Sequence, residues 1–222
     1  MRAQLMSRPR LLKTLVKFCI CTASVAILAA CSLPKQPAVQ ATSWMVLPER
    51  TGTPYKPRTD YWLKIGAVSV APPSDGKSMV YRLADQRYEK DFYNIYTTIP
   101  SEMISNATRQ WLNHANIFSA TVGQSNSFFP FYTLQASVEE FYGDYRVRPE
   151  AVVTIEFFLT VTNSGKTNPI IGTNRYSKRV VLQDNSPGAL VLGQQEALAE
   201  ILKQYEADLY QYAGKLPKPI GQ

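Results

Sequence analysis

The 222-residue sequence predicts an α+β fold: an antiparallel β-sheet meander with two amphipathic helices packed on one face. Two segments show the apolar period of 3.6 residues that is typical of helices, and several others show the alternation that is typical of strands. The chain has no regular strand–helix–strand alternation. A meander of long antiparallel strands is therefore the simplest expected arrangement.

The first part of the expected sheet contains three strands and a long loop. Residues 43–47 form a short apolar run closed by Pro48, which predicts an edge strand. Residues 49–60 contain one glycine and two prolines and are expected to form a loop. Residues 61–70 are rich in β-formers. Residues 79–92 are expected to form a hairpin around Ala84-Asp85-Gln86.

The first helix is expected to begin at Pro100, because proline suits the first helical turn. Its apolar residues recur at offsets of 0, 3, 7, 8 and 11, which places them on one stripe that faces the core. These residues are Ile104, Ala107, Trp111, Leu112 and Ala115.

The second part of the expected sheet contains a short strand at 117–122 and three long strands. The long strands are predicted at 133–145, 152–162 and 170–182. Residues 146–150 include a proline and are expected to form the hairpin loop between the first two.

The last helix is expected to start at Pro187 with Ser186 as its cap and to end at Gly214. Its apolar stripe has offsets of 0, 3, 4, 7, 11 and 14 and consists of Leu198, Ile201, Leu202, Tyr205, Leu209 and Tyr212. A single domain is therefore predicted at 43–214, and residues 215–222 are expected to form a loose tail.

The N-terminus has the pattern of an export signal. Five basic residues and no acid precede Cys31, and an apolar run at 18–30 ends in small residues. Leu28-Ala29-Ala30-Cys31 resembles the lipobox of bacterial lipoproteins. That resemblance implies that residues 1–30 are cleaved, that Cys31 receives a thioether-linked diacylglycerol, and that residues 31–42 form an acylated tether. The alternative is an uncleaved transmembrane anchor, but a bilayer core needs about 20 apolar residues and this run is shorter.

Cleavage would change the meaning of the charge and of the cysteines. The formal charge of +7 would fall to +2, because 19 basic and 17 acidic residues follow position 30. This charge, without a basic cluster, does not indicate nucleic-acid binding. Cys19 and Cys21 lie in the cleaved segment, so Cys31 would be the only mature cysteine. An internal disulfide or a cysteine-rich zinc site is thereby excluded.

The sequence shows no pattern of residues that indicates catalysis. The single histidine, His114, falls at the expected end of the first helix, where histidine is usually structural. Glu139 and Glu140 are expected on opposite faces of a strand, where they could not share a proton or a metal. No phosphate loop, dinucleotide glycine pattern or nucleophile elbow is present. We expect no catalytic residue, cofactor or metal, and hence a binding or structural module; an envelope hydrolase that uses His114 stays an alternative.

A dense aromatic cluster adjoins a polar loop. It consists of Phe128, Phe129, Phe131 and Tyr132. One interpretation is that these rings contact a partner or a lipid. The other is that the loop folds over the hydrophobic core.

Several stretches together resemble the ABC-type transport auxiliary lipoprotein family. They are 44–47, 63–72, 79–82 with Tyr88, Phe92 and Tyr93, and the helix from Pro100 through Trp111-Leu112 to Ile117-Phe118. The family usually has Tyr-x-x-Trp where this chain has Tyr93-Asn94-Ile95-Tyr96. The resemblance covers most of residues 42–200.

The resemblance implies a non-catalytic lipoprotein that works with an MCE-domain protein and an ABC permease and ATPase in lipid or solvent transport. Its expected place is the cell envelope, with the domain facing the periplasm. The residue after Cys31 is Ser32, and a sorting rule of many Gram-negative lipoproteins then indicates the outer membrane. A generic scaffolding or cell-wall-binding lipoprotein stays an alternative, and a homo-oligomer is left open.

Overall fold

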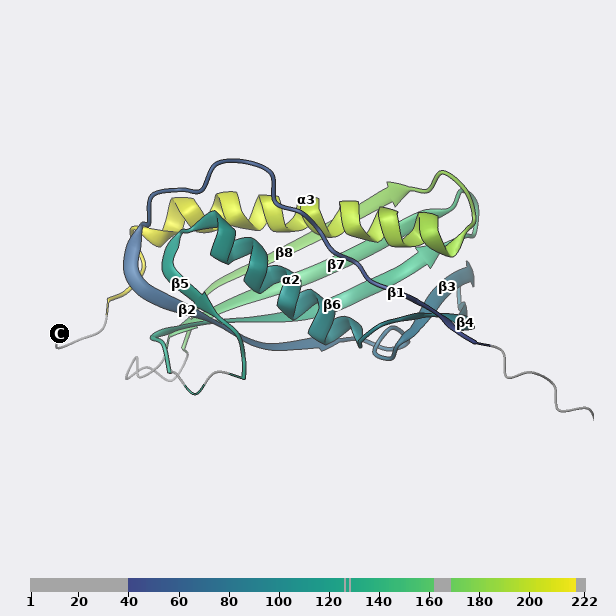
Figure 1. The fold of residues 1–222 in the computed structure, drawn as a ribbon, viewed down its shortest axis with the longest axis horizontal. Coiled ribbons are helices and arrows are strands. Elements are labelled where there is room, and N and C mark those ends of the chain that lie inside the picture. Colours follow the sequence, from purple (N-terminus) through teal and green to yellow (C-terminus); the bar gives the residue numbers. More distant parts are fainter. Residues whose placement is uncertain (1–39, 126, 128, 162–168, 219–222) are drawn as a thin grey trace, which may run out of the picture. The chain divides into compact units, whose positions relative to one another are not determined.

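The computed structural model describes residues 40–125, 127, 129–161 and 169–218, which contain eight strands and two helices (Figure 1). The predicted signal segment, Cys31 and most of the tether lie outside the described residues. In chain order, the elements are β1 (Thr42–Trp44), β2 (Thr59–Val70), β3 (Ser78–Ala84), β4 (Arg87–Tyr96), α2 (Pro100–Ala115), β5 (Phe118–Val122), β6 (Tyr132–Asp144), β7 (Glu150–Val161), β8 (Ile170–Val181) and α3 (Pro187–Ala213).

The eight strands form one mixed sheet, so the prediction of a purely antiparallel meander is wrong. Only β3–β4, β6–β7 and β7–β8 pair antiparallel. Strand β6 pairs in parallel with β2 and then with β3, while β2–β5 and β1–β4 are also parallel. The alternation of side chains is the same in parallel and antiparallel strands, and it therefore carries no information on direction.

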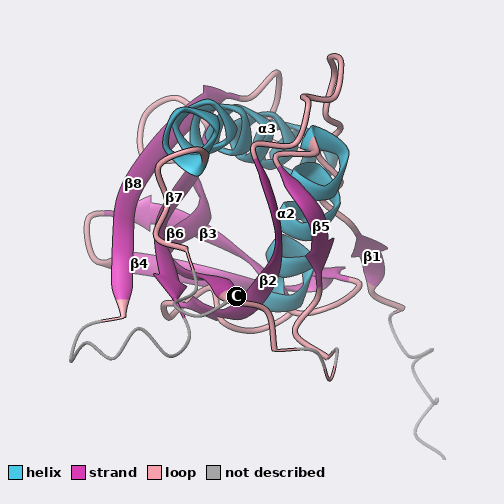
Figure 2. Cartoon of the chain, turned by 90° about the vertical axis from the view of Figure 1, so that its left-hand side faces the viewer, coloured by secondary structure: helices cyan, strands magenta, loops and turns pink. Residues whose placement is uncertain are grey.

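Both helices lie over the same face of the sheet in Figure 1, and Figure 2 shows the sheet curling around them. Helix α2 packs against β2 and β5, whereas α3 packs against β7 and β8. The predicted stripe of α2 is buried throughout. The helix ends because Asn116 adopts a left-handed φ of 59° and its N–H bonds the carbonyl of Leu112. Helix α3 begins as predicted, with the Ser186 side chain accepting a hydrogen bond from Ala189 N at 3.1 Å.

The core between the helices and the sheet is closely packed. The rings of Phe157 on β7 and Tyr205 on α3 stack with centroids 4.3 Å apart. Nearby, a Cβ atom on Gly193 would lie 2.5 Å from Leu182 Cδ2 and 2.9 Å from the Cβ of Ala151. A glycine is therefore needed where α3 lies directly against the sheet.

A segment that we call the strap, residues 45–58, links β1 to β2 and crosses over the helices in Figure 1. Arg50 of the strap donates to Glu206 on α3, from Nε at 2.8 Å and from Nη2 at 2.9 Å. The indole N–H of Trp111 on α2 donates to the same carboxylate at 2.6 Å. Glu206 thus joins the strap and both helices through one buried charge.

The far end of the strap is fixed by aromatic contacts. The rings of Tyr55 and Tyr210 stack with centroids 4.1 Å apart, and the guanidinium of Arg58 lies 4.8 Å from the Tyr210 ring. These contacts bring the chain to the start of β2.

Candidate interaction surface

The predicted aromatic cluster does not stay together in the structure. Phe128 lies outside the described residues. Tyr132 opens β6 with its side chain in the core, only 1% exposed, and Phe131 is half-buried. Phe129 is 86% exposed. The cluster therefore divides into a core part and a surface part.

The core part closes one end of the fold. The Tyr132 ring lies 5.6 Å from Phe118 and 6.0 Å from Tyr61, and Phe131 packs edge-on to it at 5.0 Å. The Tyr132 hydroxyl donates to the carbonyl of Pro217 at 2.5 Å, and burial raises the pKa of Tyr132. Phe131 and Tyr132 thus pack against the core, as in the second of the two interpretations.

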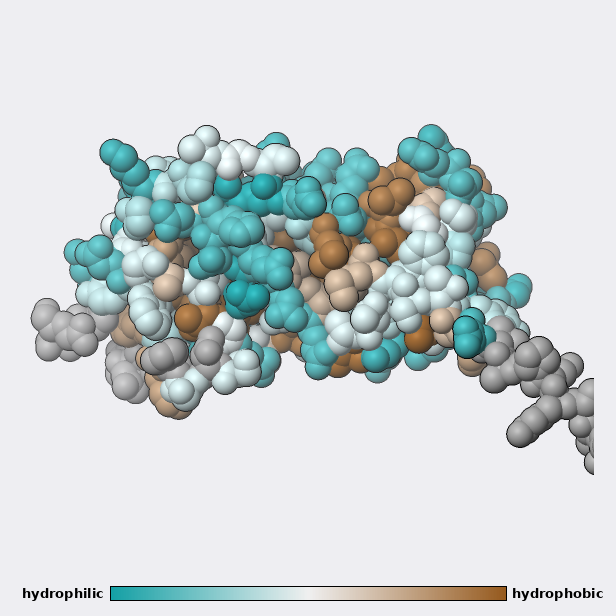
Figure 3. All heavy atoms as spheres, viewed as in Figure 1, coloured by the Kyte–Doolittle hydropathy of each residue, from teal (hydrophilic) through white to brown (hydrophobic). Residues whose placement is uncertain are grey.

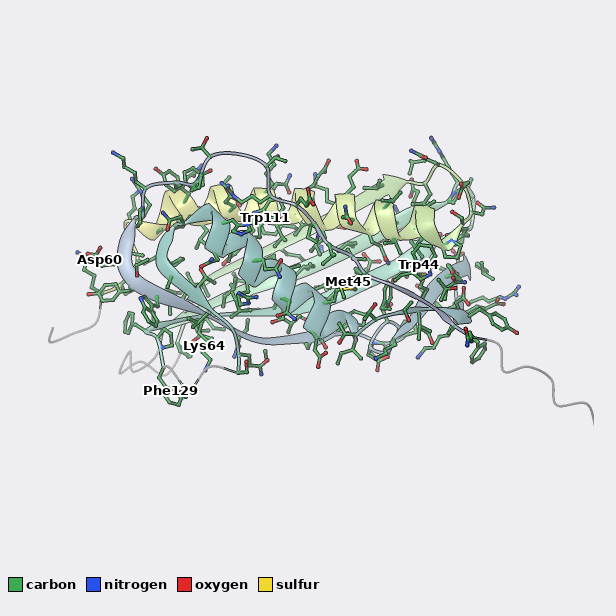
Figure 4. The ribbon with its side chains drawn as sticks, viewed as in Figure 1. Trp44, Met45, Asp60, Lys64, Trp111 and Phe129 are labelled. Atoms are coloured by element: carbon green, nitrogen blue, oxygen red, sulfur yellow. The ribbon has the colours of Figure 1, made fainter. Side chains whose placement is uncertain are left out.

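The surface part combines Phe129 with two residues of β2. Lys64 Nζ lies 5.3 Å from the centre of the Phe129 ring, a cation–π distance. Trp62 is 42% exposed and precedes Lys64 by two residues, so both side chains point to the outer face of the sheet. We call Trp62, Lys64 and Phe129 the distal surface. Figure 4 shows Phe129 and Lys64 toward the end at which β2 begins, whereas Trp44 of β1 lies toward the other end.

Trp62 is not among the predicted site residues, although the sequence carries a signal for it. Leu63 and Ile65 are core residues, and alternation along the strand places their neighbours Trp62 and Lys64 outside. An aromatic side chain on the solvent side of such an alternation is a candidate for a contact surface where other exposed apolar residues adjoin it.

A second apolar area lies where the strap meets the helices. Met45 and Leu47 line a hollow of about 320 Å³ with Met103 and Ala107 of α2. Met45 and Leu47 are 40% and 52% exposed, and Leu192 on α3 is 61% exposed. Figure 3 shows apolar residues gathered on this part of the front face.

A polar cleft at the β6–β7 turn is lined by acidic and basic residues, among them Asp144, Arg146 and Arg179. The Asp144 side chain is 5% exposed and pairs with Arg146 at 2.8 Å and Arg179 at 2.6 Å. Hydrogen bonds from Arg146, followed by those from Arg179, lower the pKa of Asp144. Arg146 and Arg179 thus pair with the carboxylates of Asp85, Asp144 and Glu150 and form a structural ion network at this cleft.

The paired carboxylates of β6, Glu139 and Glu140, lie on the same face of the sheet, whereas the sequence predicted opposite faces. The ladder pairs Val138 with Ile155 and Glu140 with Thr154, so Glu139 is the extra residue of a β-bulge. Both carboxylates consequently lie on the outer face, because a bulge interrupts the alternation of side chains. They still have separate partners: Arg175 bonds Glu139 at 2.6 Å, and the Thr154 hydroxyl bonds Glu140 at 2.6 Å.

His114 lies exposed in the last turn of α2, where the sequence places it. Within the described residues, no three His, Cys, Asp or Glu side chains are grouped so that they could hold a metal ion. In the same part of the chain, no helix is both long and apolar enough to cross a membrane.

Two solved structures with TM-scores above 0.5 show the same fold. A crystallised protein from Xanthomonas campestris is 14% identical, with a TM-score of 0.67, and the match covers 78% of this chain and 97% of that one. A second crystal structure, of a protein described as uncharacterized, is 17% identical with a TM-score of 0.56 and the same two coverages. PelC from Paraburkholderia phytofirmans, crystallised as a dodecamer, is 13% identical with a TM-score of 0.42 and coverages of 70% and 93%. Among curated proteins, none matches the chain.

A comparison with protein families is more specific than these structural likenesses. Residues 37–205 match the family described as "ABC-type transport auxiliary lipoprotein component", and this range includes every described element from β1 to most of α3. The match spans well over half of the sequence and agrees with the resemblance carried by its strands and first helix. The chain therefore belongs to the family of ABC-type transport auxiliary lipoprotein components.

Proposed function

We propose that this chain is a lipoprotein anchored through Cys31 in the outer membrane, where it serves an ABC transport system as a non-catalytic accessory. In this proposal the system moves lipid or solvent molecules across the envelope, and the direct partner is an MCE-domain protein. The family match over residues 37–205 is the observation that carries the proposal. The lipobox-like Leu28-Ala29-Ala30-Cys31 supports the anchor.

The arrangement of the described domain supports a docking role. The chain enters the fold at β1, and the distal surface lies at the opposite end (Figure 4). From Lys64 to the end of β2 at Val70, the strand extends roughly 20 Å at about 3.3 Å per residue. A domain tethered at β1 would thus hold Phe129 away from its own membrane, where a partner built on the other membrane could meet it.

The side chains of the distal surface suit a protein partner. Phe129 and Trp62 are exposed aromatic residues, and aromatic residues are enriched in protein–protein interfaces. Tryptophan is also enriched among the residues that dominate binding energy. Lys64 adds a positive charge beside the Phe129 ring. We therefore place the contact with the MCE-domain protein on this surface.

The proposal is tested by co-purification of the acylated protein with an MCE-domain protein or an ABC permease from native membranes. Phe129→Ser should weaken the association by about tenfold, which corresponds to about 1.4 kcal/mol. The unfolding midpoint should stay unchanged, because Phe129 is 86% exposed.

Leu192→Ser is the matched control, since Leu192 is also exposed but lies on α3, and it should bind like the unchanged protein. Repeated failure to recover either partner from native membranes would count against the proposal. Retention on purified peptidoglycan without any transport partner would favour a cell-wall-binding role instead.

A further inference from the structure

Two exposed aromatic residues lie beside the point where the tether enters the fold. Phe92 and Tyr93 on β4 are 81% and 57% exposed. Strands β1 and β4 pair in parallel, with Thr42 opposite Asn94. Phe92 and Tyr93 directly precede Asn94, so they lie within two residues of the point at which the chain enters β1.

Strand β4 contains extra residues at this point. Between Val80 and Ser78, strand β3 advances by two residues, whereas β4 advances by five, from Lys90 to Ile95. The extra residues of β4 form a bulge that includes Phe92 and Tyr93. A bulge of this kind redirects side chains at a sheet edge.

Asp91 fixes the shape of the bulge. Its Oδ1 accepts hydrogen bonds from the backbone N–H groups of Tyr93 at 2.7 Å and Asn94 at 2.9 Å. Its Oδ2 accepts from the Tyr81 hydroxyl at 2.8 Å and from the Asn94 side chain at 3.0 Å. Burial opposes ionisation of Asp91, but these hydrogen bonds outweigh it and lower its pKa. The two aromatic rings are therefore presented by an ordered turn.

The length of the tether limits how far this turn can be from the anchor. Cys31 and Thr42 are eleven residues apart, a span of at most about 40 Å when fully extended. A flexible chain of this length has a typical end-to-end distance of roughly 20 Å. Phe92 and Tyr93 lie close to the end of this tether, because the next residue, Asn94, pairs with Thr42 at the start of β1.

The chemistry of the two side chains fits the surface of a bilayer. Tyrosine is enriched at the level of the lipid headgroups, because its ring is apolar and its hydroxyl group is polar. Phenylalanine next to it can bury its ring at the boundary with the acyl chains. Exposed apolar patches on a protein surface mark interaction sites, and contacts with membranes are among these.

We propose that Phe92 and Tyr93 form a membrane-contact surface that rests in the headgroup region of the bilayer carrying Cys31. This inference rests on the proposed lipid anchor and adds an orientation to it. With the β1–β4 edge on the membrane, the distal surface points away from it. The contact also restricts the rotation of the domain about its tether.

The test uses the full acylated protein in lipid vesicles, with a fluorescent NBD label on Phe92→Cys. Cleavage removes Cys19 and Cys21, and the acylated Cys31 sulfur does not react, so the introduced thiol is the only labelling site. Leu192→Cys on α3 is the matched control, because Leu192 is exposed and lies on the helix layer. Doxyl-labelled lipids should quench the label at 92 several-fold more strongly than the label at 192.

A second variant checks the contact without a label. Phe92→Ser combined with Tyr93→Ser should keep the unfolding midpoint, because both side chains are exposed. On vesicles, amide exchange of the β4 bulge should be slower in the unchanged protein than in this double variant.

The inference is overturned if the vesicles carry the protein but doxyl lipids quench both labels equally. It is also overturned if the label at 92 is shielded from aqueous iodide yet not quenched by lipid, since a second copy or another protein would then cover it. Failure of the protein to float with the vesicles would overturn the lipid anchor itself, and the membrane contact with it.

Discussion

The buried charge that joins the strap to both helices allows a quantitative prediction. The Arg50 and Glu206 side chains are 5% and 7% exposed, and Glu206 also accepts the indole N–H of Trp111. Glu206→Gln keeps the size of the side chain but leaves the Arg50 charge buried without a counter-ion. Breaking a buried ion pair from one side costs about 3–5 kcal/mol, so we expect a loss of that order in the free energy of unfolding.

A double variant separates the effect of the Arg50–Glu206 ion pair from the effect of the groups around it. In Arg50→Met combined with Glu206→Gln, no charge is left unpaired and the glutamine oxygen can still accept from Trp111. We expect a smaller loss of about 1–2 kcal/mol, since uncharged replacements of buried pairs are often tolerated. The losses in the free energy of unfolding of the two single variants should therefore not sum to the loss of the double variant. The difference measures the coupling free energy between the two side chains.

The assay is urea unfolding of the acylated protein in mild detergent, followed by circular dichroism. Glu200→Gln is the control: it is the same substitution on the same helix, but Glu200 is half-exposed and pairs with Lys178 at the surface. It should cost less than about 1 kcal/mol. A Glu206→Gln loss as small as that of the control, or strict additivity in the double variant, would refute the reasoning.

Three further predictions follow from packing, charge and exposure. Gly193→Ala should destabilise the protein by about 1–3 kcal/mol, because the added Cβ has no room. Gly188→Ala on the same helix is the control: its Cβ would meet its nearest atom at 3.4 Å, so this change should be neutral or stabilising. The unfolding midpoints of the two variants provide the comparison. The folded state lowers the pKa of Asp144, so the carboxylate stabilises the protein fully above the unfolded pKa of about 3.9, and this stabilisation is lost as pH falls from there through the lower folded pKa. In a pH series, Asp144→Asn should be less stable than the unchanged protein at pH 7, and the difference in stability should begin to shrink only below about pH 4. Tyr132→Ser should cost about 3 kcal/mol or more and lower the unfolding temperature, whereas Phe129→Ser should change it little.

Much of the local structure could be predicted from the sequence because local signals determine it. The stripe of α2 repeats every 3.6 residues and is buried, and Ser186-Pro187 marks the start of α3. The hairpin around Asp85 likewise follows from turn residues between two β patterns.

The parallel pairing of β2 with β6 could not be predicted in this way. Nothing in the alternation of Leu63 and Ile65 records the direction of a neighbouring strand that lies seventy residues later. The bulge at Glu139 is a similar case, because one extra residue changes the face without changing the composition.

The candidate sites also contain features that local sequence could predict and features that it could not. Glu206 lies four residues after Leu202 and three before Leu209, so helical spacing alone could have placed this carboxylate on the buried stripe. Phe129 and Tyr132 look alike in sequence, and only the start of β6 at Tyr132 sends one ring inward and leaves the other in solvent.

The small size of β1 has a mechanical consequence for a tethered domain. Tension on the anchor would first load the three residue pairs of the β1–β4 ladder. The ion pair between Arg50 of the strap and Glu206 would be loaded only after these pairs had separated. Release of β1 alone would lengthen the tether by about 10 Å, at roughly 3.3–3.6 Å for each of the three residues of β1. In the proposed arrangement between two membranes, tension would therefore release the first strand while both helices stay packed on the sheet.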